Sequence, residues 1–213
     1  MMPILYSFRR CPYAMRARLA LSSSGQQVEL RELKLRAKPP AFLEASLSAT
    51  VPCLVCHDGA IDESLDIMKW ALEQHDPEGW LDMPDDGWAL IEEADGPFKH
   101  ALDRVKYHTR YPDVEVNEQR KVAAEFLTRL DGQISGWIYA HPTLADFAIL
   151  PFVRQFALID KSWFDNQDWP DLQGWLEAFL SSRRFADIMQ KYEPWSEGDQ
   201  QVIFPEFAND IRE

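Results

Sequence analysis

The stretch Ile4–Gly25, ILYSFRRCPYAMRARLALSSSG, decides the fold. Its first residues, Ile4–Phe8, form a short apolar and aromatic run that predicts a β-strand. Pro12–Ser24 then carries apolar residues at helical spacing and ends before a glycine, so a helix is expected there. Cys11 lies between the two, where the strand gives way to the first turn of the helix. The chain therefore opens with a strand, a tight turn and a helix.

Residues 26–75 continue as alternating strands and helices. Val28–Leu33 alternates apolar and charged residues, which is typical of a half-buried strand. We further expect a helix over Pro39–Ser46, strands over Pro52–Val55 and Ala60–Asp62 around an Asp58-Gly59 turn, and a helix over Ser64–Gln74. The element order βαβαββα predicts an α/β domain over residues 1–75.

The pattern changes at residues 76–87, DPEGWLDMPDDG, where proline, glycine and aspartate concentrate. Such a stretch is typical of a linker between domains. Beyond it we expect helices over Trp88–Tyr107 with a kink at Gly96-Pro97, Val116–Ile134, Thr143–Phe156, Asp171–Leu180 and Phe185–Lys191. Residues 88–213 are therefore predicted to form an all-α C-terminal domain, with Ser196–Glu213 as an extended tail.

The composition favours a globular protein outside membranes and secretory compartments. With 213 residues, of which 46% are hydrophobic, the chain can bury a substantial core. Its longest apolar run, Phe147–Val153, is far shorter than the ~20 residues of a membrane helix, and no export signal opens the chain. Three cysteines, an odd number, do not resemble a secreted disulfide framework. We therefore expect a cytoplasmic protein without a membrane partner.

Charge is unevenly distributed along the chain. The formal net charge of −13 argues against a nucleic-acid partner. Residues 1–50, however, hold eight basic and three acidic residues, so this part is positive while the remainder is strongly acidic. Two interpretations stay open for this asymmetry: a solvated surface, or a locally positive site for a small anion.

The position of Cys11 favours a reactive thiol. The amide groups and partial positive charge at a helix start attract an anion. Four arginines lie nearby in the sequence: Arg9, Arg10, Arg16 and Arg18. Both effects stabilise the thiolate, the form that attacks disulfides. The alternative is a small buried apolar residue, as free cysteines commonly are. Because Ala14 replaces the second cysteine of a Cys-x-x-Cys pair, redox chemistry here needs an outside thiol.

Several short motifs follow one another in a specific order. They are Cys11-Pro12-Tyr13-Ala14 with Arg16 and Arg18, Ala37-Lys38-Pro39, Val51-Pro52, Glu63-Ser64 and Thr143-Leu144-Ala145-Asp146. Together they resemble the glutathione S-transferase superfamily, and within it the omega-type transferases and the bacterial glutaredoxin 2 group. The resemblance covers the whole chain. It implies a thioredoxin-like, glutathione-binding domain over residues 1–75 and a helical second domain, in which Thr143 and Asp146 cap a helix.

The resemblance also implies a role for each matching residue. Cys11 forms the mixed disulfide with glutathione, and Tyr13 lines the bed of the tripeptide. Lys38 meets the glycyl carboxylate, while the Val51 backbone, before a cis Pro52, pairs with the cysteinyl part. Glu63 and Ser64 hold the γ-glutamyl end at a helix start. The alternatives are an ordinary exposed lysine for Lys38 and plain helix capping for Glu63 and Ser64.

A second-substrate pocket is expected around residues 95–107, which resemble a helix that faces the active site in bacterial members of the superfamily. Its candidate residues are Phe98, Tyr107, His108 and Tyr111. The run Cys53-Leu54-Val55-Cys56-His57 fits a haem-attachment pattern. On a strand, however, residues three apart point to opposite faces, so we expect neither haem nor a metal site.

The expected function is glutathione-dependent thiol transfer or reduction through Cys11. Glutathione is then the co-substrate, and a small electrophile or disulfide is the partner. One alternative is an enzyme that conjugates glutathione to an apolar electrophile. Another is a non-catalytic interaction protein of the same fold. Whether the chain forms a homodimer stays open, because no interface motif decides it.

Overall fold

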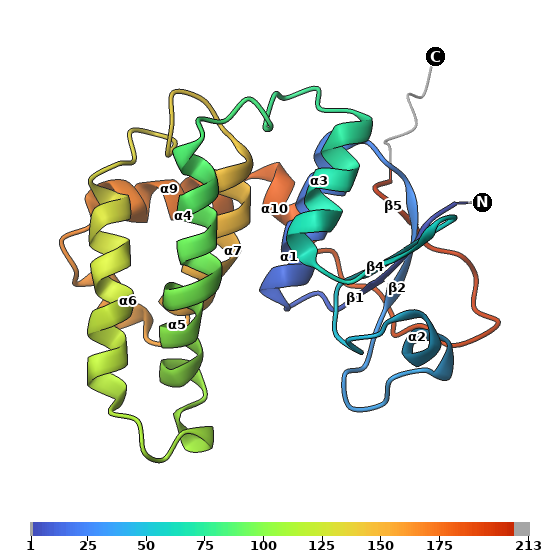
Figure 1. Ribbon diagram of the computed structural model, residues 1–213, viewed down its shortest axis with the longest axis horizontal. Coiled ribbons are helices and arrows are strands. Elements are labelled where there is room, and N and C mark those ends of the chain that lie inside the picture. Colours follow the sequence, from blue (N-terminus) through green and yellow to red (C-terminus); the bar gives the residue numbers. More distant parts are fainter. Residues whose placement is uncertain (1, 207–213) are drawn as a thin grey trace. The chain divides into compact units, whose positions relative to one another are not determined.

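The computed structural model describes residues 2–206, which divide into two units (Figure 1). Unit 1 contains residues 2–77 and 186–206, and unit 2 contains Glu78–Phe185. Unit 1 holds a five-stranded sheet with helices, whereas unit 2 is built of helices. The predicted fold class, an α/β domain followed by a helical one, is confirmed.

The sheet of unit 1 has the strand order β4-β3-β1-β2-β5. Its strands are β1 (Ile4–Ser7), β2 (Val28–Glu32), β3 (Cys53–Cys56), β4 (Gly59–Ile61) and β5 (Ile203–Phe204). β1 and β2 run parallel, and the other neighbours run antiparallel. Parallel strands need a crossover connection, and the first helix supplies it between β1 and β2. The turn before that helix therefore lies at the carboxyl end of β1.

Three helices of unit 1 follow the predicted order: α1 (Pro12–Ser24), α2 (Pro40–Ala45) and α3 (Ser64–Gln74). Local signals bound α1, since Pro12 stands in its first turn and Gly25 ends it with a φ of 70°. α1 and α3 lie side by side (Figure 1). A separate buried cluster consists of Tyr6, Leu33, Phe42, Val51 and Cys53, and both Phe8 and Cys11 pack against it.

The C-terminal part of the chain differs from the prediction. Residues 186–206, expected within an all-α domain over residues 88–213, belong to unit 1. β5 pairs antiparallel with β2, and the Trp195 amide donates to the Glu32 carbonyl at 2.8 Å. The physical reason is the open edge of β2, whose backbone groups need partners. Of the predicted tail Ser196–Glu213, residues 207–213 lie outside the described residues.

The predicted linker over residues 76–87 is largely part of unit 2, which begins at Glu78. Trp80 within it is fully buried and stacks on Phe147, with ring centroids 3.8 Å apart. The Trp80 carbonyl also accepts a hydrogen bond from the Leu144 amide at 2.9 Å. Because burial of a large aromatic side chain is strongly stabilising, this segment folds as the first part of unit 2.

The helices of unit 2 are α4 (Asp86–Glu93), α5 (Lys99–Lys106), α6 (Val116–Asp131), α7 (Leu144–Ala157), α8 (Lys161–Asp165) and α9 (Pro170–Leu180), and α10 (Arg183–Ile188) starts here and ends in unit 1. At the predicted kink the chain forms a π-helical turn over Ala94–Phe98. Such a turn accommodates the amide hydrogen that Pro97 lacks. The predicted cap of α7 is confirmed, because Thr143 and Asp146 form a capping box. The short α8 was not predicted.

Candidate active site

Cys11 caps the N-terminus of α1, as the sequence predicts. Its backbone is extended, with φ −74° and ψ 124°, and its amide donates to the Phe8 carbonyl at 2.9 Å. This turn carries the chain from β1 into α1. The side chain is partly exposed, and its Sγ atom lies 3.6 Å from the Val51 carbonyl oxygen. The thiol is therefore accessible and held beside the segment that leads into β3.

The other two cysteines have different surroundings. Cys53 is buried in β3, and burial raises the pKa of its thiol to about 12. Burial also raises the pKa of the Cys56 thiol, and the Asp58 carboxylate adds to this effect. Both thiols therefore stay protonated near neutral pH, which leaves Cys11 as the candidate nucleophile.

A buried arginine lies beneath the turn that holds Cys11. Arg18 is 1% exposed, and its guanidinium donates to Ser7 Oγ at 2.7 Å and to the Arg9 carbonyl at 2.6 Å. Burial lowers the pKa of Arg18 to about 10, while attraction to Glu32 and Cys11 acts in the opposite direction. Arg18 therefore stays charged at neutral pH and favours negative charge on Cys11.

One cavity of 370 Å³ brings together five of the residues that the resemblance singled out: Tyr13, Val51, Pro52, Glu63 and Ser64. We call it the Tyr13 cavity. The peptide bond between Val51 and Pro52 is cis, as expected. Glu63 occupies the N-cap position of α3 without a side-chain capping hydrogen bond, and Ser64 is the first residue of this helix, so the N-terminus of α3 lies at the cavity. Cys11 adjoins the cavity through its contact with the Val51 carbonyl.

Two further residues line this cavity and were not predicted, Thr50 and Asp62. The Asp62 carboxylate accepts hydrogen bonds from Ser46 Oγ at 2.7 Å and from the Ser48 amide at 3.0 Å. Burial acts to raise the pKa of Asp62, but hydrogen bonds from these partners outweigh it and lower the pKa. Asp62 thus holds the loop 46–50 beside the cavity. The signal in the sequence was its position directly before Glu63.

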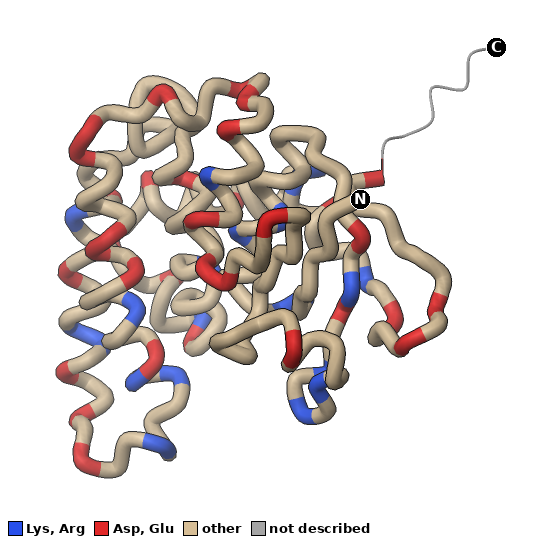
Figure 2. The backbone as a smooth tube through the Cα atoms, turned by 45° about the vertical axis from the view of Figure 1, so that its right-hand side comes forward, with Lys and Arg blue, Asp and Glu red and all other residues tan. Residues whose placement is uncertain are grey.

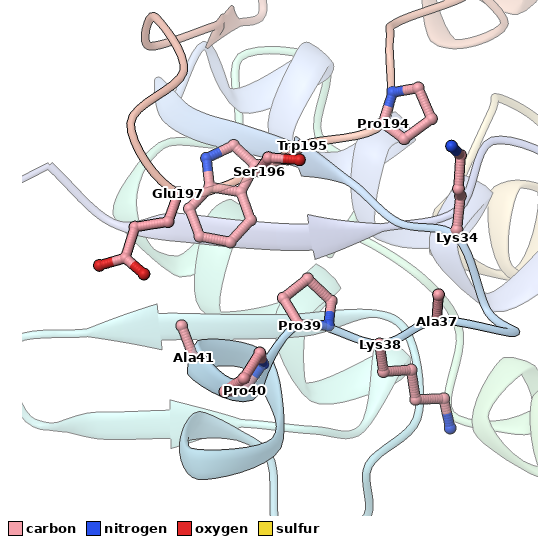
Figure 3. Close-up of a pocket in the computed structure, with 10 residues that line it drawn as sticks. All are labelled: Lys34, Ala37, Lys38, Pro39, Pro40, Ala41, Pro194, Trp195, Ser196 and Glu197. Atoms are coloured by element: carbon pink, nitrogen blue, oxygen red, sulfur yellow. The ribbon is translucent and has the colours of Figure 1, made fainter.

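Lys38 is attached to the same loop but does not line the Tyr13 cavity. Its Nζ atom donates to the Ala49 carbonyl at 2.8 Å. Together with Trp195, it lines a separate cavity of 510 Å³ (Figure 3). Figure 3 shows its ammonium group pointing away from the Trp195 ring. Lys38 therefore supports the edge of the Tyr13 cavity from outside.

The four candidates for a second-substrate pocket have different environments in unit 2. Phe98 is 1% exposed and stacks on Phe126, with ring centroids 4.7 Å apart. It is a core residue, which corrects its assignment to a pocket, because a side chain packed on all sides offers no surface to a ligand. Tyr107 is half-buried, whereas His108 and Tyr111 are exposed.

Within residues 2–206, no three His, Cys, Asp or Glu side chains are grouped so that they could bind a metal ion. None of the helices in this part of the chain has the length and apolar character needed to cross a membrane.

Comparison with protein families finds two matches. The family model described as "Glutathione S-transferase, N-terminal domain" matches residues 5–79, and "Glutathione S-transferase, C-terminal domain" matches residues 113–178. A curated relative from Aplysia californica, named "Probable glutathione transferase", is 37% identical over 57 residues. That stretch is 27% of this chain and 62% of the relative, so the match spans less than two thirds of the relative's length.

Solved structures share the fold at low sequence identity. A glutathione transferase family member from Pseudomonas fluorescens pf-5, with two glutathione bound, has a TM-score of 0.74 at 17% identity and covers 88% of this chain and 92% of its own. Glutathione transferase Omega 3C from Trametes versicolor has a TM-score of 0.72 at 17% identity, with 92% of each chain covered. At such identities the likeness extends to the fold alone.

Proposed function

Since the chain belongs to the glutathione S-transferase family, we propose that it is a glutathione-dependent thiol transferase or reductase that acts through Cys11. The observation that carries this proposal is the location of Cys11. Its thiol is partly exposed at the start of α1, 3.6 Å from the Val51 carbonyl and beside the Tyr13 cavity. A cysteine in this position can exchange with a bound disulfide and take over its glutathionyl group, whereas a hydroxyl could only hydrogen-bond to a bound thiol.

The Tyr13 cavity supports glutathione as the ligand by its size and by its chemistry. Its 370 Å³ lies within the range of about 300–1,000 Å³ that is usual for small-molecule pockets. The Glu63 carboxylate can accept the γ-glutamyl ammonium, and the amides at the start of α3 with the Ser64 hydroxyl can hold its carboxylate. The backbone of Val51, before the cis Pro52, leaves polar groups for the cysteinyl part.

The proposed reaction runs in two exchanges. The Cys11 thiolate attacks the glutathionyl sulfur of a mixed disulfide, so the Cys11–glutathione disulfide forms and the partner leaves as a thiolate. A second glutathione thiolate then attacks the glutathionyl sulfur on Cys11. This step forms glutathione disulfide and returns Cys11 as a thiolate. In total, one mixed disulfide and one glutathione become one free thiol and one glutathione disulfide, with no other oxidant or reductant.

The test measures covalent capture and turnover together. The protein is incubated with a glutathionyl mixed disulfide, and mass spectrometry locates the adduct. We expect one glutathionyl group on Cys11, steady release of the free thiol when glutathione is added, and loss of both in Cys11→Ser. Cys56→Ser is the matched control, because Cys56 is the other partly exposed thiol and should leave adduct and turnover unchanged.

Two outcomes would reject the proposal in different directions. Activity on an aryl halide alone, unaffected by Cys11→Ser, would make the protein a conjugating transferase. Failure to bind immobilised glutathione, together with no adduct at Cys11, would instead favour a non-catalytic interaction protein of the same fold.

A further inference from the structure

Unit 1 contains a third cavity, smaller than the two described above, at the turn before Cys11. Its volume is 230 Å³, and three segments line it: the turn after β1, the end of β2 and the C-terminal segment that follows α10. The lining residues are Phe8, Arg9, Arg10, Glu32, Leu33, Lys34, Lys191, Tyr192 and Pro194. We call it the basic cavity, because four of these nine residues are basic and one is acidic.

Only Glu32, which attracts Arg9, offsets part of the positive charge among the residues that line this cavity. Lys34 and Lys191 are exposed and form no ion pair within the described part of the chain. The Arg9 guanidinium donates to the Met189 carbonyl at 3.3 Å, and the Arg10 guanidinium lies over the Phe8 ring at 5.5 Å. Both of these partners are uncharged, so neither contact neutralises a guanidinium group.

The single acidic residue of the cavity is already engaged. Glu32 is 7% exposed, its Oε1 accepts a hydrogen bond from the Arg9 amide at 2.6 Å, and its Oε2 lies 3.9 Å from Arg18. Burial raises the pKa of Glu32, while the hydrogen bond from the Arg9 amide and the attraction of Arg18 and Arg9 act in the opposite direction. Burial likewise raises the pKa of Tyr192, so its phenol stays a hydrogen-bond donor. One acidic residue therefore stands against four basic residues, so the residues that line the cavity carry a net positive charge.

The positive charge of the basic cavity contrasts with the negative net charge of the chain. The formal net charge of the chain is −13, and Figure 2 shows acidic residues along the backbone of both units. Four basic residues at one small cavity in such a chain create a local field that attracts anions and repels cations. Of the two interpretations that the charge asymmetry of residues 1–50 allowed, these contacts favour an anion site.

The basic cavity and the Tyr13 cavity share no lining residue, and Cys11 belongs to the chain segment between them. Phe8, Arg9 and Arg10 come directly before Cys11, whereas Tyr13 follows it after Pro12. Cys11 and Phe8 also pack against the same buried cluster, to which Leu33 belongs. Along the chain, Cys11 therefore lies between a segment that lines the basic cavity and a residue that lines the Tyr13 cavity.

We propose that the basic cavity binds a carboxylate of the substrate that exchanges disulfides with Cys11, so that the enzyme prefers acidic thiol partners. This inference rests on the proposed function. The cavity is smaller than the ~300 Å³ of a typical whole-ligand pocket, which suits one acidic group rather than a second tripeptide. Arg9 and Arg10 supply donors in fork geometry, and Lys34 and Lys191 supply point charges.

The test compares three mixed disulfides of glutathione, formed with mercaptosuccinate, 2-mercaptoethanol and cysteamine. They carry an acidic, a neutral and a basic partner on the same glutathionyl group. We expect kcat/KM to be highest for the mercaptosuccinate disulfide. In the double variant Lys34→Gln/Lys191→Gln, the acidic-to-neutral ratio of kcat/KM should fall about five- to tenfold, mainly through KM. The matched control is Arg36→Gln, an exposed cation on the same loop that lines neither cavity and should keep the ratio.

A binding measurement separates this inference from the proposed chemistry. Titration calorimetry of succinate, with succinamide as the neutral control, is carried out on the full chain carrying Cys11→Ser. We expect succinate to bind and the lysine double variant to lose this binding. An unchanged selectivity ratio and unchanged succinate binding in the double variant would overturn the inference, as would an equal loss in Arg36→Gln. Succinate binding without turnover of any disulfide would reject the proposed function and still support the anion site.

Discussion

Two helix starts in this protein carry similar backbone polarity and use it differently. At α7, Asp146 is fully buried and accepts hydrogen bonds from the Thr143 amide at 2.9 Å and from the Ile138 amide at 3.0 Å. At α1, the capping residue is Cys11, whose Sγ lies 3.6 Å from the Val51 carbonyl and is partly exposed. One helix start is closed by the protein's own carboxylate, and the other presents a thiol to a cavity.

The difference separates a structural from a chemical use of the same electrostatics. A helix N-terminus favours negative charge wherever it occurs. When a buried carboxylate such as that of Asp146 supplies that charge, the interaction stabilises the folded state. When an accessible thiol lies there, with the buried charge of Arg18 nearby, the benefit is a more stable thiolate. Substitutions at the two sites should therefore affect different properties of the protein.

The largest expected effect is on turnover in Cys11→Ser. We expect kcat/KM for glutathionyl disulfides to fall by at least about a thousandfold, because serine cannot form the disulfide intermediate. The thermal unfolding midpoint should stay within a few degrees, since the substitution is nearly isosteric and the side chain is partly exposed. A large fall in the unfolding midpoint would mean that the Cys11 position supports the fold after all.

The converse is expected for Asp146→Ala. This change leaves the Trp175 indole N–H and two backbone amides in the interior of unit 2 without their acceptor. We expect the free energy of unfolding to fall by about 3 kcal/mol, measured by urea denaturation. The folded fraction should still be glutathionylated at Cys11 at the wild-type rate. A slower glutathionylation of Cys11 per folded molecule would show that the two helix starts do not act independently.

Asp62→Asn should have a smaller effect, on both binding and acid stability. Removal of the charge weakens the hydrogen bonds that hold loop 46–50, so KM for glutathione should rise severalfold. The pKa of Asp62 is lowered in the folded state, so its charge contributes stability above its unfolded pKa of about 3.9, which is lost as the pH falls through the folded value. The free energies of unfolding of the wild type and of Asp62→Asn, measured in urea, should differ at neutral pH and become equal in acid. A constant difference at all pH values would exclude the charge as the cause.

The smallest effect is expected for Lys38→Gln. Because Lys38 bonds to the Ala49 carbonyl outside the Tyr13 cavity, we expect KM for glutathione to rise about threefold while kcat stays unchanged. Arg36→Gln, which removes an exposed cation from the same segment between β2 and α2 as Lys38, should leave KM for glutathione unchanged. A fall in kcat for Lys38→Gln would show that this lysine acts on the reacting sulfur rather than on binding.

Much of unit 1 could be predicted from short-range patterns. Pro12 and Gly25 bound α1, and the turn that joins β3 to β4 is His57-Asp58, one residue before the predicted Asp58-Gly59. These features depend on the conformational preferences of one or two residues, which do not need the rest of the chain. The cis bond before Pro52 was expected from the resemblance alone, since the local preference of such a bond is trans.

The candidate site was predictable where a motif supplies a side chain directly. Cys11, Tyr13 and Glu63 belong to such motifs, and the latter two line one cavity. Thr50 and Asp62 escaped prediction because their place in the wall depends on how loop 46–50 is held. The expectation that Phe98 lines a pocket comes from the resemblance of residues 95–107 to a helix that faces the active site, and no motif shows which side chains of that helix face a ligand and which, like Phe98, are buried in the core.

By itself, the sequence determined the order of the elements from β1 to α3, the thiol at the start of α1 and the capping box of α7, because each depends on neighbours within a few residues. Only the tertiary structure decided that the C-terminal segment joins the edge of β2 and that Lys191 meets Arg9 and Lys34 at one cavity. The contact between Arg9 and Met189 joins residues 180 positions apart. No local preference encodes such a pairing, because it forms only when the open strand edge and apolar surfaces of the folded unit find partners.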